Sequence, residues 1–252
     1  VMRKFVAGFL AFIIVFITPV VVSGQTLSYN YTRPFDLALF YFAYGRWDLV
    51  PSELNRALQE NPKDAELLAF VGSFLSALGD QNQAKDFLGE AEKVKASPGI
   101  LVLQGDVYRL LNNPKKAEEY YKKALQRQPS SVMAYIGIGK LREQSNQLEE
   151  ALGFYLQAST LNPNRLDTLM SIGRIQYQLN QYEEAVEQFR KAVELDPAGA
   201  RTHLWYAKAL LAAGNVERGL QQLERTLELD SSIDEAVVLL NQWQLEDQQS
   251  DV

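Results

Sequence analysis

The sequence predicts an all-α fold, in which about six helix-turn-helix repeats stack in order and a last helix caps the C-terminal end. Three observations predict it: a pattern that recurs about every 34 residues, apolar residues at helical spacing, and a turn-forming residue at a fixed place in each unit. Because one helix pair cannot bury its apolar face alone, neighbouring pairs must stack.

A small residue recurs at an almost constant interval, with spacings of 34, 33, 34, 34 and 34 residues. Its six positions are Ala38, Gly72, Gly105, Gly139, Gly173 and Ala207. Seven residues after each comes a residue type that tolerates the positive φ of a helix C-terminus. These six residues are Gly45, Gly79, Asn112, Asn146, Asn180 and Gly214. We therefore expect the first helix of every unit to end there.

The fifth unit shows how each element follows from its residues. Apolar residues keep roughly helical spacing over 166–179, which predicts an amphipathic first helix. After a short turn, residues 182–195 predict a second helix. Gly173 lets the two helices approach closely, and Phe189 fills the gap beside them. Pro197 then blocks continuation of the helix and fits the start of the next unit.

The second helices share a frame of Ala, a bulky or aromatic residue, Ala and Pro at fixed spacing. It is seen in EEAVEQFRKAVELDP (183–197), EEALGFYLQASTLNP (149–163) and KKAEEYYKKALQRQP (115–129). These residues resemble the tetratricopeptide repeat (TPR), a 34-residue helix-turn-helix family. The resemblance implies a right-handed α-solenoid with repeats at 31–64, 65–97, 98–131, 132–165, 166–199 and 200–233. A capping helix at 234–245 and a frayed polar tail at 246–252 are expected to follow.

Composition argues against most catalytic chemistry. The chain has no cysteine and one histidine, so thiolate chemistry, histidine metal sites and histidine-dependent triads have almost nothing to build from. No phosphate-binding, calcium-binding or nucleophile-elbow motif occurs. Without residues 1–24 the charge is 23 − 31 = −8, which argues against nucleic-acid binding. We therefore expect no enzyme activity, no cofactor and no metal.

The resemblance implies a protein-binding scaffold whose first helices line a concave groove. Its ninth repeat position carries a cation in three consecutive units, at Lys140, Arg174 and Lys208. Other groove positions implied by the resemblance hold Arg109, Tyr177 and Arg201. On an acidic protein, such a basic row suggests capture of an acidic segment or a terminal carboxylate. The alternative is an ordinary solvated helix face that happens to carry Lys and Arg.

The first two repeats predict a different, mostly apolar groove that includes Phe35, Leu39 and Phe42. One interpretation is that it receives an amphipathic partner helix or a second copy of the chain, which would make a homo-oligomer. The other is that the preceding residues fold back and cover it, namely Leu27, Tyr29 and Tyr31.

Two functions follow from these patterns. The first is a non-enzymatic scaffold that binds a protein segment in its groove. The second is a structural or assembly subunit of an envelope or secretion complex that acts through self-association. An enzyme or a carbohydrate-binding module would need a cluster of convergent polar groups that the sequence does not show.

Residues 1–24 predict a signal peptide or an uncleaved signal-anchor helix, followed by a short linker at 25–30. Arg3 and Lys4 precede a 13-residue apolar run, Phe5–Ile17, of signal-peptide length. The uncharged stretch is also marginally long enough for a transmembrane helix. Either interpretation puts the repeats on the extracytoplasmic side, periplasmic or secreted, soluble after cleavage or tethered to the membrane.

Overall fold

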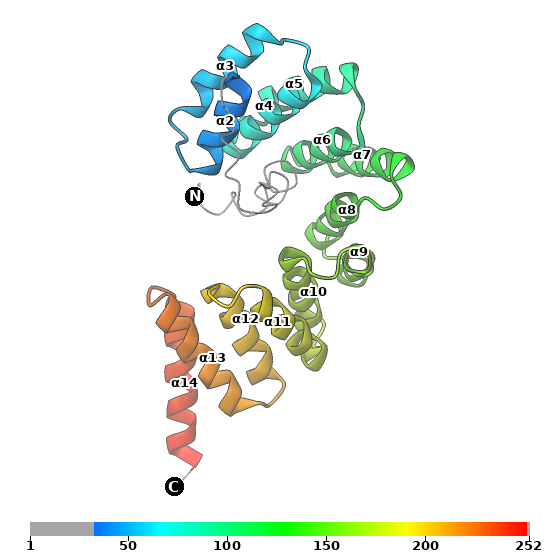
Figure 1. Cartoon of the computed structure of the whole chain (residues 1–252). Helices are drawn as coiled ribbons and strands as arrows, with labels where there is room; N and C mark the ends of the chain where they lie inside the picture. Colours follow the sequence, from blue (N-terminus) through cyan, green and yellow to red (C-terminus); the bar gives the residue numbers. More distant parts are fainter. Residues whose placement is uncertain (1–32, 251–252) are drawn as a thin grey trace, which may run out of the picture. The chain divides into compact units, whose positions relative to one another are not determined.

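The computed structural model describes residues 33–250, with side chains up to residue 243. Within this part the chain forms thirteen helices and no strand (Figure 1), which confirms the predicted all-α class. Residues 1–24 and 25–30, for which a leader and a linker are predicted, lie outside it. None of the helices in residues 33–250 is both long enough and apolar enough to cross a membrane.

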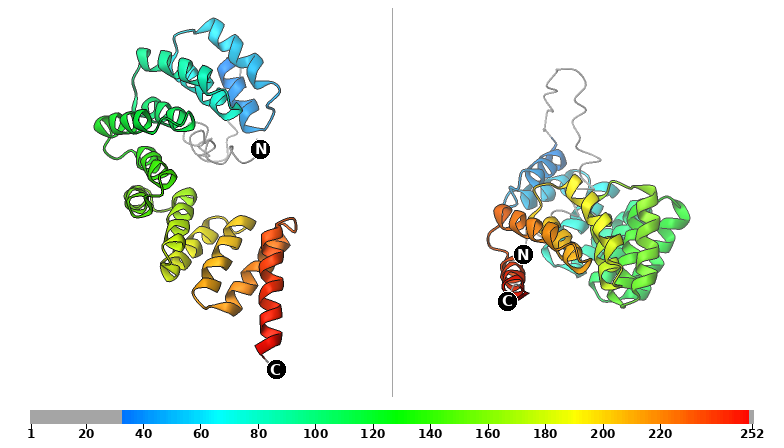
Figure 2. Two further views of the ribbon diagram at one scale, coloured as in Figure 1. Left: turned by 180° about the vertical axis from the view of Figure 1, so that it is seen from behind. Right: turned by 90° about the horizontal axis from the view of Figure 1, so that it is seen from below.

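The chain divides into two units, residues 1–129 and 130–252. The described part of the first unit holds three helix pairs, and each predicted repeat range contains one of them. Figure 2 shows the members of each pair side by side and antiparallel. The pairs are α2 (Pro34–Ala43) with α3 (Val50–Glu60), α4 (Ala65–Leu78) with α5 (Gln81–Val94), and α6 (Pro98–Leu110) with α7 (Pro114–Arg127).

The second unit repeats this plan and adds a single helix. Its pairs are α8 (Val132–Gln144) with α9 (Leu148–Leu161), α10 (Leu166–Gln178) with α11 (Tyr182–Leu195), and α12 (Ala200–Ala212) with α13 (Val216–Leu229). The single helix is α14 (Asp234–Ser250). It runs five residues past the expected end at 245, because neither Gly nor Pro interrupts the sequence there. Ala236 of α14 is fully buried against Leu204 and Leu211 of α12.

The turn inside every pair is fixed by a backbone conformation that few residue types tolerate. Positive φ angles, between 54° and 93°, occur at all six predicted positions. These residues are Gly45, Gly79, Asn112, Asn146, Asn180 and Gly214. Since Gly pays no steric cost and Asn a small one in this conformation, the sequence prediction of these helix ends is confirmed.

Within a pair, a large side chain of the second helix packs on the small residue of the first. A Cβ added at Gly173 would lie 2.8 Å from Cε1 of Phe189, and one at Gly139 would lie 2.9 Å from Cε1 of Tyr155. Phe189 and Tyr155 are fully buried. The close helix approach predicted from the small residues is therefore present, and it needs a residue without a Cβ at these points.

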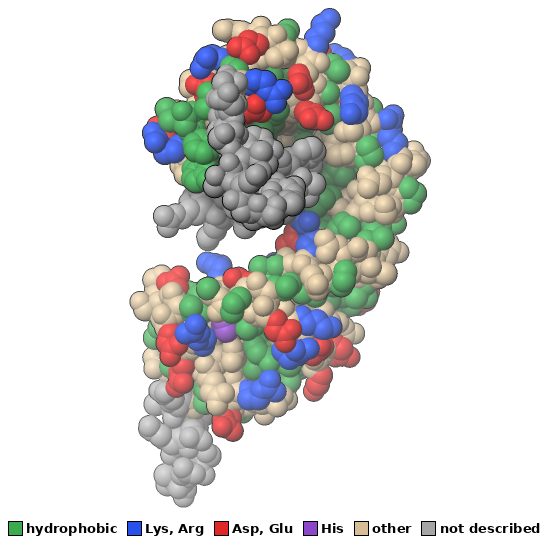
Figure 3. Space-filling view, viewed as in Figure 1, with side chains coloured by type: hydrophobic (Ala, Val, Ile, Leu, Met, Phe, Trp, Pro, Cys, Tyr) green, Lys and Arg blue, Asp and Glu red, His purple; other side chains and the backbone are tan. Residues whose placement is uncertain are grey.

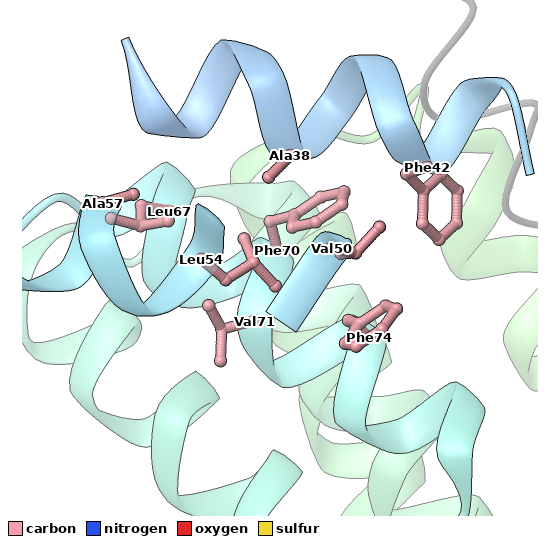
Figure 4. Close-up of a cluster of buried hydrophobic side chains, with 9 residues drawn as sticks. All are labelled: Ala38, Phe42, Val50, Leu54, Ala57, Leu67, Phe70, Val71 and Phe74. Carbon is pink, nitrogen blue, oxygen red and sulfur yellow. The ribbon is translucent and has the colours of Figure 1, made fainter. Parts of the chain in front are cut away.

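The core of the first unit contains Phe42, a residue of the predicted apolar groove. Phe42 is 4% exposed, and its ring meets Trp47 edge-on with centroids 4.6 Å apart. The ring also packs edge-on against Phe70 and Phe74, because it projects toward α4 (Figure 4). The cluster drawn in Figure 4 consists of Ala38, Phe42, Val50, Leu54, Ala57, Leu67, Phe70, Val71 and Phe74.

Candidate functional site

The three cations of the predicted basic row lie at the same position of α8, α10 and α12, on the first helix of each pair in the second unit. All three side chains are partly exposed. The Arg174 side chain is 36% exposed and that of Lys208 20% exposed. The structure gives each of the three a different set of partners, so they are not equivalent as binding groups.

Arg174 forms an ion pair with Glu143 of the preceding repeat. Glu143 also accepts a hydrogen bond of 2.8 Å from the hydroxyl of Tyr155. Burial raises the pKa of Tyr155, and the charge of Glu143 raises it further, so the phenol keeps its proton and donates it. Glu143 thus holds the Arg174 guanidinium at one edge and leaves its other donors available.

The side chain of Lys208 is more enclosed than that of Arg174. Its Nζ lies 2.6 Å from Oε1 of Glu235, which the final helix α14 supplies. The same ammonium lies 4.4 Å from the ring centroid of Trp205 and 5.9 Å from that of Tyr177. These rings meet edge-on, 6.0 Å apart, so Lys208 combines an ion pair with cation–π contacts. Tyr177 therefore lies beside Lys208 of the basic row.

Lys140 forms no ion pair with any described residue. The reason lies in the repeat register. Glu235 follows Lys208 by 27 residues, and the residue that follows Lys140 by 27 is Asp167. Asp167 is already held by two hydrogen bonds from Arg165, of 2.6 and 2.9 Å. Lys140 is consequently the cation of the row whose charge is uncompensated by a direct contact.

Arg201 and Arg109, two further predicted groove residues, have contrasting environments. Arg201 is exposed in the first turn of α12. Arg109 is largely buried in the first unit, with its side chain 15% exposed and its Nη2 3.4 Å from Asp106. Asp106 in turn accepts a 2.8 Å hydrogen bond from the hydroxyl of Tyr121. Arg109 is thus held by a polar cluster of the first unit, and its role as a groove cation stays a prediction.

The predicted apolar groove of the first unit is largely filled. Phe35 packs edge-on against Phe70, with ring centroids 5.7 Å apart, and is partly buried against the core cluster of Figure 4. Leu39 is partly buried against the same cluster. The residues that were considered as a cover, Leu27, Tyr29 and Tyr31, lie outside the described residues.

Ionisable side chains elsewhere in the described part serve packing and pairing. His203 is 6% exposed, with its ring nitrogens 2.7 Å from the side-chain oxygen of Gln222 and 3.1 Å from the carbonyl oxygen of Pro197. Among residues 33–243, no group of three or more His, Asp or Glu side chains is placed to hold a metal ion. On the face of the second unit shown in Figure 3, Lys and Arg are interspersed with Asp and Glu.

Sequence reasoning did not place Trp205 or Glu235 at the site. A signal for Glu235 exists in the repeat register, since it stands two repeats after Asp167, at the position that Arg201 holds in the repeat between. Trp205 also carries a signal, because it precedes Lys208 by three residues on α12 and therefore shares a helix face with it.

Comparisons with known proteins agree with this architecture. The tetratricopeptide repeat family model matches residues 102–165, and a TPR repeat model matches residues 173–214. A TPR repeat-containing protein of Dictyostelium discoideum is 34% identical over 76 residues, which is 30% of this chain and 29% of that protein. These matches support the TPR resemblance. TPR proteins are generally non-enzymatic scaffolds, and a fold of this kind suggests protein–protein interaction.

Several solved structures share the fold at low sequence identity. PilF of Pseudomonas aeruginosa superposes with a TM-score of 0.69 at 16% identity, over 84% of this chain and 96% of PilF. YrrB, a TPR protein with an unusual peptide-binding site, superposes with a TM-score of 0.56 at 21% identity, over 74% of this chain and 96% of YrrB. A chain of the APC/C hetero-tetramer Cut9–Hcn1 superposes with a TM-score of 0.72 at 15% identity, over 83% of this chain and 42% of that chain. At these identities the likeness shows the fold alone.

Proposed function

We propose that this chain is a TPR scaffold that binds an acidic protein segment along the first helices of its second unit. The observation that carries the proposal is the unequal pairing of the basic row. Glu235 already occupies Lys208, and Glu143 occupies one edge of Arg174, while Lys140 has no direct counter-charge among the described residues. An incoming carboxylate therefore meets least competition at Lys140 and at the remaining donors of Arg174.

The pairs already present also show how a bound segment would be held. Glu235 reaches Lys208 from α14 in the way that a carboxylate of a ligand would reach Lys140. Tyr177 and Trp205 add aromatic surface next to this end of the row. A segment with acidic residues beside an apolar one matches these two kinds of contact. The proposed ligand is therefore an acidic segment whose carboxylates contact Lys140 and Arg174.

We further propose that the repeats act outside the cytoplasm, a proposal that rests on the sequence of residues 1–24 alone. If a signal peptidase cleaves the chain, the mass of the mature protein should be lower by about the mass of residues 1–24. Mass spectrometry of the protein recovered from its native host measures the difference. An unchanged mass together with resistance to carbonate extraction indicates an anchor, and recovery in the cytoplasm contradicts export altogether.

The binding proposal predicts that Lys140→Glu, Arg174→Glu and Lys208→Glu together weaken binding of acidic peptides by about tenfold or more. Each charge-assisted hydrogen bond contributes roughly 1.5–3 kcal/mol, so losing even one such contact gives this factor. The measurement is fluorescence anisotropy with labelled peptides of equal length that share a Leu-containing core and differ in their Asp and Glu content. Binding to the unaltered protein should strengthen with acidic content and weaken with added salt.

A matched control reverses the charge of three cations on the second helices. Its substitutions are Arg190→Glu and Lys191→Glu on α11 and Arg225→Glu on α13, where each cation pairs with an acid of its own helix. The control should retain most of the binding. Equal loss of peptide binding in both triple variants would show that net charge alone explains the effect. If the unaltered protein binds none of the peptides, the proposal is contradicted.

A further inference from the structure

A pocket of about 540 Å³ lies in the first unit between α5 and α6, with one wall from α7. Its volume is within the range of roughly 300–1,000 Å³ that is typical of ligand pockets. It belongs to the interface between the second and third repeats and is separate from the basic row of the second unit. Six of its lining residues carry the argument: Gly89, Glu90, Glu92, Gln104, Tyr108 and Tyr120.

Two polar residues of this pocket stand where other repeats are mostly apolar. The equivalents of Gln104 in the repeat register are Leu37, Val71, Ile138, Ile172 and Tyr206. The equivalents of Glu92 are Leu58, Leu125, Ser159, Val193 and Leu227. In each set four of the five counterparts are aliphatic, and the exceptions are Tyr206 and Ser159, so the solenoid does not require a charged or amide group at either place. The interface between the second and third repeats nevertheless brings an amide and a carboxylate together.

Gly89 is the third pocket residue that differs from its counterparts in the other repeats, and its lack of a side chain keeps the pocket open. It lies in the interior of α5, where Gly is less favourable than Ala. A Cβ added there would meet one neighbour, Nε2 of Gln104, at an ordinary contact distance of 3.9 Å. Packing therefore does not demand a glycine. The equivalents of Gly89 in the other repeats all carry side chains: Asn55, Lys122, Leu156, Arg190 and Glu224.

Glu92 is the carboxylate of the pocket that has no ion pair with any residue between 33 and 243. Lys93 pairs with Glu90 at 2.6 Å, and Lys85 pairs with Asp86 at 3.6 Å, so the other charges of the lining compensate one another. The Glu92 side chain receives two long hydrogen bonds, 3.3 Å from the Tyr120 hydroxyl and 3.5 Å from Nε2 of Gln104. The pocket consequently carries one uncompensated negative charge.

Gln104 is 2% exposed, and its carbonyl oxygen Oε1 is buried and accepts no hydrogen bond from the described part of the chain. Leaving such an acceptor unpaired is unfavourable. Because the Nε2 of the same amide is directed to Glu92, the amide cannot exchange its two ends without facing its oxygen to a carboxylate. The fixed amide thus leaves the Glu92 carboxylate as the acceptor that the pocket offers to a ligand.

Tyr108 and Tyr120 form the aromatic wall, with their rings stacked 5.4 Å apart at 12°. Two lysines of the chain lie over them, Lys116 at 5.1 Å from the Tyr108 centroid and Lys123 at 4.9 Å from the Tyr120 centroid. Burial raises the pKa of Tyr120 to about 12, with the charge of Glu92 adding to the effect. Tyr120 thus remains a neutral donor to Glu92, and each of the two rings already has a lysine ammonium over its face.

We propose that this pocket binds a guanidinium group, supplied as the side chain of an arginine in a partner protein. A guanidinium presents its donors in a planar fork that matches a carboxylate in a bidentate way, so it suits Glu92, whose Oε2 already takes the two long hydrogen bonds. An ammonium has a single charged centre without this fork and matches the same carboxylate less well. The site would make the first unit a second contact region, specific for a basic residue.

The test uses the full chain and three blocked amino acids, N-acetyl-arginine, N-acetyl-lysine and N-acetyl-leucine methylamides. Binding is followed by NMR, through the ring signals of Tyr108 and Tyr120. We expect saturable shifts with the arginine probe, weaker ones with lysine and none with leucine. Equal binding of the lysine and arginine probes would overturn the guanidinium assignment, and no saturable shift with any probe would overturn the site.

Two variants and one control locate the binding. Glu92→Gln should weaken the arginine probe by about tenfold or more, since a charge-assisted contact is lost. Gly89→Met should abolish binding by filling the pocket and should raise the melting temperature, because Met favours a helix interior over Gly. The control Glu228→Gln makes the same charge change on α13 of the second unit, at an exposed carboxylate that Arg225 already holds at 2.7 Å, and binding should change less than about twofold. Full binding by Glu92→Gln or by a folded Gly89→Met would overturn the proposal.

Discussion

Replacing Phe189 by alanine is expected to destabilise the second unit by about 3–5 kcal/mol, the usual cost of removing a buried aromatic side chain. Phe189 is fully buried, packs on Gly173 and lies with its ring 5.9 Å from that of Trp205, tilted by 22°. Alanine would leave a cavity that neither rigid neighbouring helix can close. Denaturant unfolding monitored by circular dichroism measures the loss.

The effect should be local as well as large, because Phe189 supports the residues of the candidate site. Trp205 lies between Phe189 and the Lys208 ammonium, which is 4.4 Å from the indole ring. We therefore expect faster hydrogen exchange in α10, α11 and α12 than in α8. Leu156→Ala on α9 is the control, since its side chain is 46% exposed and its loss should cost less than about 1 kcal/mol. Equal destabilisation by the two variants would contradict this role of Phe189.

The fold could be predicted in detail where it depends on local backbone chemistry. Asn112, Asn146 and Asn180 adopt positive φ because few other residues can, so their recurrence marks the helix ends in the sequence itself. The pairing of Gly173 with Phe189 is equally local, since the two lie on the two helices of one repeat. Such features depend on spacing along the chain, and spacing is visible without a structure.

The candidate site was less predictable, because pairing partners come from other repeats. Lys140, Arg174 and Lys208 occupy the expected register, yet Glu143 and Glu235 change what two of them can bind. The repeat pattern likewise does not show which charged side chains are partly buried by contacts with their neighbours. In physical terms, helix periodicity predicts which face a residue is on, and only the tilt of adjacent helices decides what it meets there.

The contacts of the first unit could not be predicted for the same reason. The repeat position of Arg109 predicts a groove residue, and it does not show that Asp106 and the Tyr121 hydroxyl form a polar cluster beside it. The repeat position of Phe42 likewise does not show that its ring packs against Phe70 and Phe74 of the next repeat. The missed pocket is different, since comparing equivalent positions between repeats would have shown its unusual residues.

Substituting valine for Gly105 is expected to destabilise the first unit by about 3 kcal/mol, the sum of overpacking and of a disturbed buried hydrogen bond. A Cβ at this position would lie 2.5 Å from Cε1 of Tyr121. The ring has nowhere to move, because Tyr121 is fully buried and its hydroxyl is held 2.8 Å from Asp106. Thermal and denaturant unfolding of the full chain, with hydrogen exchange in α6 and α7, measure the effect.

The matched control is Gly153→Val, in which the same side chain is added to an exposed glycine of α9 with nothing within 4 Å of its Cβ. Valine and glycine differ little in helix propensity, so this variant should remain within about 0.5 kcal/mol of the parent. The clash itself is tested by adding Tyr121→Ala to Gly105→Val. If the two side chains collide, the double variant loses at least about 1 kcal/mol less than the sum of the single losses, because the cavity left by Tyr121 accepts the valine. Strictly additive losses would show that Gly105 is needed for a reason other than the close approach of α6 and α7.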